Sequence, residues 1–378
     1  MDDVYDQRLT VAFDFPVIFT RQVFAPGNAA LANAIDRKGG ARPHRVIAYV
    51  DGGVEPLVPA VAGYFAAHRA VAELVLPPQI VTGGEATKSG WTQVRQIMTT
   101  LGEQRLCRHS VVVIVGGGGV LDMVGFAASL VHRGLRVVRV PTTVLGQNDA
   151  GVGVKTGMNE HGQKNFVGTF APPFAVLNDV TLLTTLPDRE WVGGIAEAFK
   201  VALIKDAAFF DWLCGAAARL RARDLDAMEQ LIRRCAELHL DHIRTSGDPF
   251  EQGSARPLDY GHWSAHRLEV LSGFTLGHGQ AVAVGLALDS YYASRQGFIS
   301  AADLERLLRG LTASGLPVWH ELLERTEVLD GLEQFREHLG GELTLAMPAG
   351  VGRLQQIHAV DRAVIADGIR YLKSWRST

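Results

Sequence analysis

The chain has 378 residues, of which 47% are hydrophobic and 20% are charged, and 37 Lys and Arg against 40 Asp and Glu give a formal net charge of −3. This composition is that of a soluble globular protein of about two domains, and it excludes a disordered or fibrous chain. A near-neutral chain has no strongly basic surface, so nucleic acid is not an expected partner. The widely spaced Cys107, Cys214 and Cys235 argue against a disulfide framework and a cysteine-based metal site.

The N-terminal segment and the most apolar stretch of the chain argue against a secreted or membrane protein. The segment that begins Met1-Asp2-Asp3 is acidic and polar, unlike a secretory signal. The run 111–131 carries Asp122 and several glycines, which fits a buried strand, a turn and a helix better than a membrane span. We therefore expect a cytoplasmic, enzyme-like protein with no membrane partner.

The first half of the chain alternates short apolar runs with helical patterns. Such alternation predicts a parallel sheet that is covered by helices on both faces. The predicted strands are 45–50, 71–76, 110–115, 136–140 and 175–177, and the predicted helices are 56–70 and 90–101. Residues 9–13 and 16–23 are further strand candidates, which would pair as an N-terminal hairpin.

The pattern changes near Leu186-Pro187-Asp188, after which helical periodicity dominates. The predicted helices are 189–204, 207–220, 225–244, 261–271, 279–295 and 301–314. Asp188 is a candidate cap for the first of them. We expect an α/β domain over residues 1–186, an all-α domain over residues 187–378, and a ligand site in the cleft between them.

A glycine run, Gly116–Gly119, follows a predicted strand and opens a predicted helix. Bare backbone N–H groups at the start of a helix can hold a pyrophosphate. The G-x-G-x-x-G spacing is not met, because Leu121 stands where the third glycine would be, so a plain tight turn is the alternative. Asp51, which ends the first strand, can accept from a ribose hydroxyl or act as a turn residue.

Two histidines and a glutamate form a candidate metal site. His262 and His266 lie four residues apart and share one face of a predicted helix, His278 follows, and Glu197 lies on an earlier helix. Two histidines and one carboxylate are the ligand set of a catalytic zinc, although histidine pairs of this spacing are also common on surfaces and in cores.

A third group of polar residues lies in a glycine-rich segment that we predict to be a loop. It contains Asp149, Lys155, Lys164 and Asn165. These residue types suit a phosphorylated, hydroxylated ligand, and a solvated surface loop is the alternative.

Taken together, these segments resemble the sugar phosphate cyclase superfamily, whose best-known members are the 3-dehydroquinate synthases. The resemblance runs from about Asp51 to His278. It is carried by GGGGVLD at 116–122, HRG at 132–134, VPTTVLGQND at 140–149, VGVKTG at 152–157, KN at 164–165, LPDREW at 186–191, GIAEAFK at 194–200, YGHWSAH at 260–266 and LGHGQAVAVGLAL at 276–288. GVGVKTG, GDPFEQG at 247–253 and DYGHWSAH look most like the EboD-like branch.

The resemblance implies a dehydroquinate synthase-like fold with Rossmann-like nucleotide binding, and NAD and Zn²⁺ or Co²⁺ as cofactors. It puts Glu197, His262 and His278 at zinc-ligand positions. The NAD-contacting positions are Asp51, Glu85, Lys88, Gly116, Gly117, Gly118, Asp122, Thr142 and Thr143. The substrate-pocket positions are Asp149, Lys155, Lys164, Asn165, Lys200 and His266, of which Lys155, Lys200 and His266 would hold phosphate and stabilise an enolate. Arg133 matches an arginine that reaches the phosphate of the neighbouring subunit, which implies a homodimer.

One segment departs from the pattern of the 3-dehydroquinate synthases. They typically read R-x-x-x-N-x-G-H, where Arg and Asn help to hold a carboxylated substrate, whereas this chain reads ARPLDYGH. Asp259 replaces the asparagine, Arg256 is displaced by one residue, and a lysine usual upstream is absent from 239–244. Asp259 would repel a substrate carboxylate but would accept from a neutral polyol. Arg256 itself, or His239, His242 or Arg244, can still supply the lost cation.

We therefore expect a lyase-type cyclase whose substrate is a neutral ketose phosphate, with sedoheptulose 7-phosphate favoured, and whose product is a valiolone-type cyclitol. Transient oxidation by NAD acidifies a proton, phosphate leaves by β-elimination, NADH returns the hydride, and an intramolecular aldol addition closes the ring. The alternatives are a 3-dehydroquinate synthase, a metal-dependent alcohol or glycerol dehydrogenase, and a non-catalytic binding protein derived from a cyclase.

Overall fold

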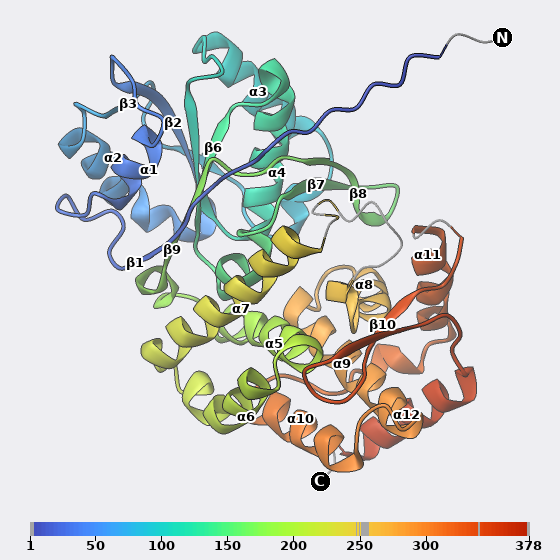
Figure 1. The fold of residues 1–378 in the computed structure, drawn as a ribbon. Coiled ribbons are helices and arrows are strands. Elements are labelled where there is room, and N and C mark those ends of the chain that lie inside the picture. The colour runs from blue at the N-terminus through green and yellow to red at the C-terminus, as the bar shows by residue number, and fades with distance from the viewer. Residues whose placement is uncertain (1–3, 247, 249, 251–256, 339–340, 376–378) are drawn as a thin grey trace.

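The computed structural model of the chain describes residues 4–246, 248, 250, 257–338 and 341–375. Figure 1 shows an α/β part, coloured blue to green, above a helical part, coloured light green to red. This arrangement confirms the predicted order of an α/β part followed by a helical part. Within the described residues, no helix combines the length and the apolar character needed to cross a bilayer.

The described residues form a seven-stranded sheet at the centre of the α/β part, and its paired strands run parallel. The strand order is β1-β9-β6-β5-β2-β3, and β4 also pairs with β2. The strands are β1 (Val17–Thr20), β2 (His44–Asp51), β3 (Ala72–Leu74), β4 (Gln79–Val81), β5 (Val111–Gly116), β6 (Arg136–Pro141) and β9 (Ala175–Asp179). The strands predicted from the apolar runs between residues 45 and 177 are confirmed, and β4 is additional.

Helices cover both faces of this sheet, because successive residues of a strand point to opposite sides. On β2, Val46 and Val50 pack in an apolar cluster with α1 and α2, whereas Ile47 and Tyr49 pack in another with α3 and α4. These helices are α1 (Ala30–Asp36), α2 (Val58–Ala67), α3 (Thr92–Glu103) and α4 (Gly118–Leu130). The helix predicted over 56–70 is shorter, because a 3₁₀ turn takes residues 52–57.

The predicted N-terminal hairpin is wrong. Residues 9–13 form no strand, and β1 pairs in parallel with β9, where Val17 lies opposite Val176. An isolated two-stranded hairpin is only marginally stable in water. Pairing with β9 instead adds β1 to a sheet that helices already cover.

The glycine-rich segment after Asp149 is not the predicted loop. It contains β7 (Lys155–Glu160) and β8 (Gln163–Phe170), which pair antiparallel. β7 packs against α4, and Thr156 Oγ1 lies 2.8 Å from Thr169 Oγ1 across the hairpin. The polar composition suggested a loop, but Thr156 and Thr169 pair with each other across the hairpin.

The helical part is built around two long, buried helices, α5 (Asp188–Lys205) and α9 (His278–Arg295). The other helices are α6 (Ala207–Arg221), α7 (Leu225–Thr245), α8 (His262–Leu271), α10 (Ala301–Ala313), α11 (Asp330–His338) and α12 (Arg362–Trp375). The helices predicted between residues 189 and 314 are confirmed. The sequence analysis missed α11, α12 and an antiparallel pair of strands, β10 (Leu345–Pro348) and β11 (Leu354–Ile357).

The predicted cap of α5 is wrong. Asp188 is the first residue of the helix, Pro187 takes the cap position, and no side chain caps the helix. The carboxylate of Asp188 still lies in the first turn, where it interacts favourably with the helix dipole.

Candidate active site

Glu197, His262 and His278 come together where three helices meet. Glu197 lies on α5, and His262 and His278 are the first residues of α8 and α9. Glu197 Oε1 lies 3.5 Å from His262 Nε2 and 3.3 Å from His278 Nε2. One donor atom from each residue lies within 4.8 Å of the other two, so the group can hold one metal ion.

Glycines allow the three helices to approach one another this closely. A Cβ at Gly279, the second residue of α9, would lie 2.1 Å from the carbonyl oxygen of Gly193 on α5. A Cβ at Gly285, further along α9, would lie 2.0 Å from the carbonyl oxygen of Gly261, in the turn before α8. A larger residue would push α9 away, so these glycines set the distances within the group.

Both histidines of this group have a partner for Nδ1. His262 Nδ1 lies 3.0 Å from the carbonyl oxygen of Tyr260, and His278 Nδ1 lies 3.0 Å from Glu269 Oε2. An Nδ1–H that donates to these oxygens leaves the lone pair on Nε2, which faces Glu197. The histidines are therefore oriented as metal ligands.

Asp289 supports the turn before α8, and the sequence analysis missed it. Its carboxylate accepts from the backbone N–H of Gly261 at 3.0 Å and from Trp263 Nε1 at 2.7 Å. Burial raises the pKa of Asp289 to about 7. Asp289 lies on α9, so its contact with this turn depends on how α9 packs against α8, which no local motif reveals.

Glu269, a second missed residue, links Lys164 to His278. Glu269 Oε1 accepts from Lys164 Nζ at 2.6 Å, and Oε2 faces His278. Burial would raise the pKa of Glu269, but His278 and Lys164 hold it well below its usual value. Glu269 also forms a metal-capable group with His266 and His278. In the sequence, the position of Glu269 one helical turn after His266 is the signal that could have revealed it as a site residue.

A second ion-pair network lies at the other oxygen of Glu197. Lys200 Nζ lies 2.5 Å from Glu197 Oε2. Burial would lower the pKa of Lys200, but Glu197, Asp149 and Asp259 raise it, so the ammonium stays charged. Asp149 Oδ1 also lies 2.9 Å from Nδ1 of His239 on α7. The structure thus brings Lys200, Asp149 and Asp259 together beside the metal-capable group.

His266 lies beside the two histidines of the metal-capable group. Its ring centroid is 5.3 Å from that of His262 and 6.0 Å from that of His278. Burial and the neighbouring His262 hold the pKa of His266 well below its usual value. The imidazole is therefore neutral at pH 7, and its surroundings disfavour its protonated form.

The glycine run Gly116–Gly119 forms the predicted turn, because β5 ends at Gly116 and α4 begins at Gly118. Asp51 accepts from the backbone N–H of Gly117 at 3.2 Å and from that of Gly53 at 2.8 Å. Asp51 therefore joins the ends of β2 and β5 at one edge of the sheet.

The chain is packed tightly around this turn. A Cβ at Gly119 would lie 2.7 Å from the carbonyl oxygen of Gly84. Thr142 and Thr143 follow β6, and a Cβ at Gly117 would lie 3.1 Å from the methyl group of Thr143. Gly119, the fourth glycine of the run, is therefore required, because the segment around Gly84 leaves no room for a side chain there.

Buried Lys88 contacts two other residues that the sequence analysis expects to contact NAD, Glu85 and Asp122. Lys88 Nζ lies 2.7 Å from Asp122 Oδ2 and 3.8 Å from Glu85 Oε1. Burial would lower the pKa of Lys88, but Asp122 and Glu85 raise it. Lys88 also donates to Asn165 Oδ1, so Asn165, a substrate-pocket candidate, bonds with this group.

The remaining candidate residues are Lys155, Arg133 and Arg256. The side chains of Lys155 and Arg133 are exposed. Arg133 has no hydrogen bond or ion pair with the described part of its own chain, and its backbone is left-handed, with a φ of 64°. Arg256 lies outside the described residues.

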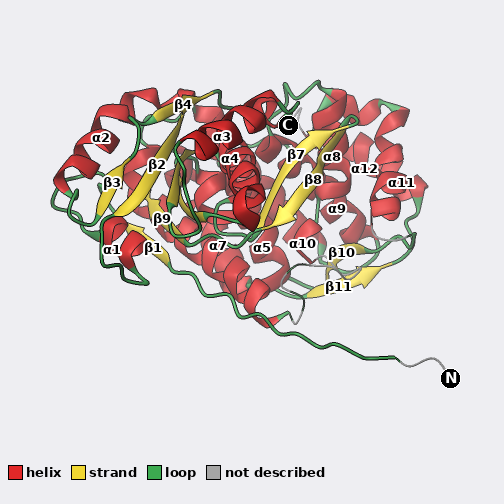
Figure 2. Ribbon diagram, turned by 90° about the horizontal axis from the view of Figure 1, so that it is seen from above, coloured by secondary structure: helices red, strands yellow, loops and turns green. Residues whose placement is uncertain are grey.

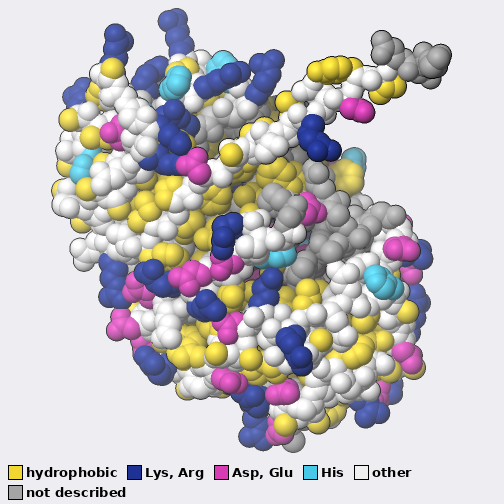
Figure 3. Space-filling view, in the orientation of Figure 1, with side chains coloured by type: hydrophobic (Ala, Val, Ile, Leu, Met, Phe, Trp, Pro, Cys, Tyr) yellow, Lys and Arg dark blue, Asp and Glu magenta, His cyan; other side chains and the backbone are white. Residues whose placement is uncertain are grey.

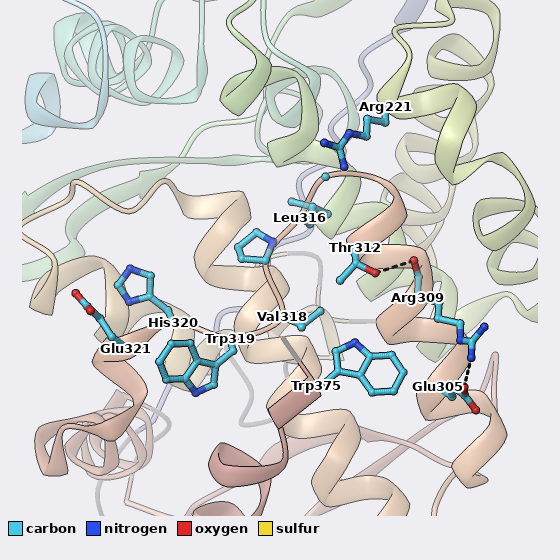
Figure 4. Close-up of a pocket in the computed structure, with 12 residues that line it drawn as sticks. Arg221, Glu305, Arg309, Thr312, Leu316, Val318, Trp319, His320, Glu321 and Trp375 are labelled. Atoms are coloured by element: carbon cyan, nitrogen blue, oxygen red, sulfur yellow. Dashed lines mark hydrogen bonds and ion pairs between the residues drawn. The ribbon is translucent and has the colours of Figure 1, made fainter. Parts of the chain in front are cut away.

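A cavity of about 1120 Å³ lies in the helical part, away from these groups. Figure 4 shows Trp319, Trp375 and Arg309 among its lining residues. It contains none of the candidate site residues, so its size alone does not mark it as the active site.

Comparisons with known sequences assign the family. Models of the 3-dehydroquinate synthase N-terminal and C-terminal regions match residues 78–193 and 194–337. The 3-dehydroquinate synthase of Ruegeria pomeroyi (strain ATCC 700808 / DSM 15171 / DSS-3) is 37% identical over 287 residues, which are 74% of this chain and 75% of that protein. The enzyme of the same name from Ruegeria sp. (strain TM1040) is 36% identical over 74% of each chain.

Solved structures show the same relationship. ValA (2-epi-5-epi-valiolone synthase) from Streptomyces hygroscopicus subsp. jinggangensis 5008, with NAD⁺ and Zn²⁺ bound, has a TM-score of 0.88 and 29% identity over 98% of this chain and 99% of that chain. A 2-deoxy-scyllo-inosose synthase complexed with carbaglucose-6-phosphate, NAD⁺ and Co²⁺ shares the fold, with a TM-score of 0.75 and 22% identity over 94% of this chain and 96% of that chain. The chain therefore belongs to the 3-dehydroquinate synthase family of sugar phosphate cyclases.

Proposed function

We propose that this protein converts a neutral ketose 7-phosphate, sedoheptulose 7-phosphate, into a valiolone-type cyclitol with release of phosphate. The choice of a neutral sugar rests on Asp259. The carboxylate of Asp259 raises the pKa of Lys200, as Glu197 does, so Asp259 belongs to the same ion-pair network. A substrate carboxylate held there would face Asp259 and Asp149 at short range. The hydroxyl groups of a neutral sugar can instead donate to these carboxylates.

Two buried lysines of this region support the same choice. Each of them faces a carboxylate of the chain: Lys200 with Glu197, and Lys164 with Glu269. A carboxylated substrate would have to compete for cations that are already paired. A neutral polyol needs no such competition.

We also propose that Glu197, His262 and His278 hold one divalent cation, Zn²⁺ or Co²⁺. Among the described residues, neither carboxylate oxygen of Glu197 accepts a hydrogen bond of normal geometry. The charged side chains of this region leave a formal charge of −2, which a divalent cation would neutralise. Lys164 and Lys200 carry the two positive charges, and the four negative charges are those of Glu197, Glu269, Asp149 and Asp259. When bound, the cation supplies a Lewis acid for a substrate oxygen.

NAD is assigned to the glycine turn Gly116–Gly118. The N-terminal end of α4 carries the positive end of the helix dipole, which suits a pyrophosphate. The further contacts in this proposal are Asp51, Glu85, Lys88, Asp122, Thr142 and Thr143. When bound, NAD supplies hydride transfer and is regenerated within the catalytic cycle.

The side chains of this chain would hold the substrate. Lys200, which stays charged, stabilises negative charge on a substrate oxygen, and neutral His266 offers a ring nitrogen for a hydrogen bond with the substrate. Lys155 binds phosphate, and Lys164, Asp149, Asn165, Arg256 and Asp259 orient the sugar. Arg133 of the partner subunit completes the phosphate site in a homodimer.

A 3-dehydroquinate synthase is the second candidate function, because curated relatives of that name are 37% and 36% identical to this chain. The test measures phosphate release from sedoheptulose 7-phosphate and from 3-deoxy-arabino-heptulosonate 7-phosphate, with the products identified by NMR. A higher kcat/KM for the neutral sugar, with Asp259→Asn narrowing the gap, supports the proposal. A preference for the carboxylated sugar overturns it, and accumulation of NADH indicates a dehydrogenase.

A further inference from the structure

Arg139, on the inner strand β6, is a buried charged residue that the proposed function does not use. Figure 3 shows Lys and Arg side chains at the surface of the molecule, whereas Arg139 is 1% exposed. Burial lowers the pKa of Arg139 to about 10, so the guanidinium is charged at pH 7. Within the described residues, Arg139 forms no ion pair, and its Nε has no hydrogen-bond partner. A buried charge without a counter-charge costs free energy, so packing alone does not explain this side chain.

The guanidinium of Arg139 binds the backbone of one segment of the chain. Nη1 donates to the carbonyl oxygens of Gly153 at 2.7 Å and Gly151 at 3.2 Å, and Nη2 donates to that of Lys155 at 3.3 Å. Residues 151–154 are buried, so their carbonyl groups need donors from within the protein. A guanidinium presents its N–H donors in a rigid plane, and Arg139 therefore holds three carbonyl groups in one fixed arrangement.

The segment 151–155 connects two candidates for the substrate pocket. Asp149 lies shortly before it, and Lys155, its last residue, begins β7. Figure 2 shows the hairpin of β7 and β8 between α4 and α8, where β7 packs against α4 and the side chain of Lys164 on β8 contacts α8. Because one of the bound carbonyl groups belongs to Lys155 itself, the position of its backbone depends on Arg139.

We propose that Arg139 is a positioning residue for phosphate binding, which fixes the backbone of residues 151–155 so that the ammonium group of Lys155 meets the phosphate of the substrate. The inference rests on the proposed function, in which Lys155 binds phosphate. The side chain of Lys155 is exposed, and a long exposed side chain has many conformations. A fixed backbone limits the region that its ammonium group reaches, so less freedom is lost when phosphate binds.

The test is a double-mutant cycle on the affinity for inorganic phosphate, measured by isothermal titration of the NAD-saturated protein. Lys155→Met removes a charge-assisted hydrogen bond and should weaken phosphate binding about tenfold. Arg139→Gln should weaken it at least about threefold, but by no more than Lys155→Met does. Because Arg139 acts through Lys155, the double variant should bind phosphate as weakly as Lys155→Met alone. Unchanged affinity in Arg139→Gln, or losses that multiply in the double variant, overturns the proposal.

A second variant separates the geometry of the guanidinium from its charge. Arg139→Lys keeps the positive charge but lacks the planar set of donors, so it should also weaken phosphate binding. An affinity equal to that of the parent would mean that the charge suffices, which overturns the proposal. Arg139→Lys also replaces Arg139→Gln in the cycle if the glutamine variant does not fold.

The matched control is Arg45→Gln. Arg45 is exposed on β2 and also donates to two backbone carbonyl oxygens, those of Gln104 and Arg105, outside the segment 151–155. This variant should bind phosphate like the parent.

NAD affinity distinguishes positioning from a general structural role. It should be unchanged in the Arg139 variants, and a loss of NAD affinity equal to the loss of phosphate affinity overturns the proposal. Unchanged phosphate affinity in Lys155→Met overturns the phosphate assignment of the proposed function and this inference with it. Independent losses from Lys155→Met and Arg139→Gln overturn this inference alone, so the two failures are distinguishable.

Discussion

Lys164 and Asn165 are consecutive residues of β8, yet their side chains contact different groups of the candidate active site. Lys164 Nζ lies 2.6 Å from Glu269 Oε1, beside the metal-capable group, whereas Asn165 Oδ1 accepts from Lys88. The backbone of Asn165 is left-handed, with a φ of 55°, a conformation that asparagine tolerates better than most residues. This short segment of β8 therefore connects the metal-capable group with the proposed NAD contacts.

This connection predicts separable effects for the two residues. Asn165→Ala removes an acceptor from the Lys88 ammonium, and a hydrogen bond to a charged group contributes about 1.5–3 kcal/mol. We expect NAD affinity to fall by about tenfold or more, with metal content unchanged. Lys164→Met should leave NAD affinity unchanged and lower kcat/KM for phosphate release. Isothermal titration with NAD measures the first effect, and an equal loss of NAD affinity in both variants would contradict this separation.

Glu197→Gln should abolish metal retention. Glutamine is neutral and offers a much weaker ligand oxygen, while the ion pair with Lys200 and the negative charge of the group are lost at the same time. Mass-spectrometric metal analysis after gel filtration should find about one divalent metal per chain in the parent and almost none in the variant. Glu305→Gln, in the cavity of the helical part, is the control. Full activity after exhaustive chelation would exclude a catalytic metal.

Gly117→Asp should abolish NAD binding. The new carboxylate would lie beside Asp51 and Thr143 and would repel a pyrophosphate at the start of α4. Gly63→Ala is the control, because Gly63 lies on α2, outside the turn, and a Cβ there would meet nothing within 4 Å. If Gly117→Asp titrates NAD like the parent, the pyrophosphate binds elsewhere.

Arg133→Ala and Glu197→Ala subunits should complement each other. In a mixed dimer, one site retains Glu197 from its own subunit and Arg133 of the partner subunit. Each variant alone should be nearly inactive. Mixing the two should restore up to about one quarter of the activity of the unchanged protein, because random pairing makes half of the dimers heterodimers and each heterodimer has one intact site of two. Phosphate release from the mixture measures this, and purified, differently tagged heterodimers should reach about half of the activity. Absence of activity in such a heterodimer would argue against action of Arg133 on the neighbouring site.

Asp206 should stabilise the fold in a pH-dependent manner. Its carboxylate caps α6 through the N–H of Phe209 at 3.0 Å and pairs with Arg234 at 2.5 Å. Burial would raise the pKa of Asp206, but these two partners lower it. The stabilisation is therefore present at neutral pH and is lost as pH falls below about 4.

The variant Asp206→Ala should lower the free energy of unfolding by about 1–2 kcal/mol at pH 7. Asp206→Asn, which keeps an acceptor oxygen, should cost less. Urea unfolding at several pH values checks both variants. A constant difference between the parent and Asp206→Ala from neutral pH to about pH 3 would contradict the role of the charge.

The sequence by itself determined the parallel sheet and the main helices, because their signals are local. A continuous apolar run such as 110–115 specifies a strand buried on both faces, and period 3.6 specifies a helix wherever it occurs. The motifs also pointed to Glu197, His262 and His278, which the structure brings together. The boundary near residue 186, the EboD-like branch and the roles of the site residues stay predictions.

The tertiary structure decided what depends on contacts between distant segments. Glu269 and Asp289 carry no motif of their own, and each joins the site only because helices pack on one another. The hairpin of β7 and β8 looked like a loop, because its polar groups gave no hydrophobic alternation. Burial and hydrogen bonding between residues far apart in the chain are properties of the packed molecule, so a local pattern does not contain them.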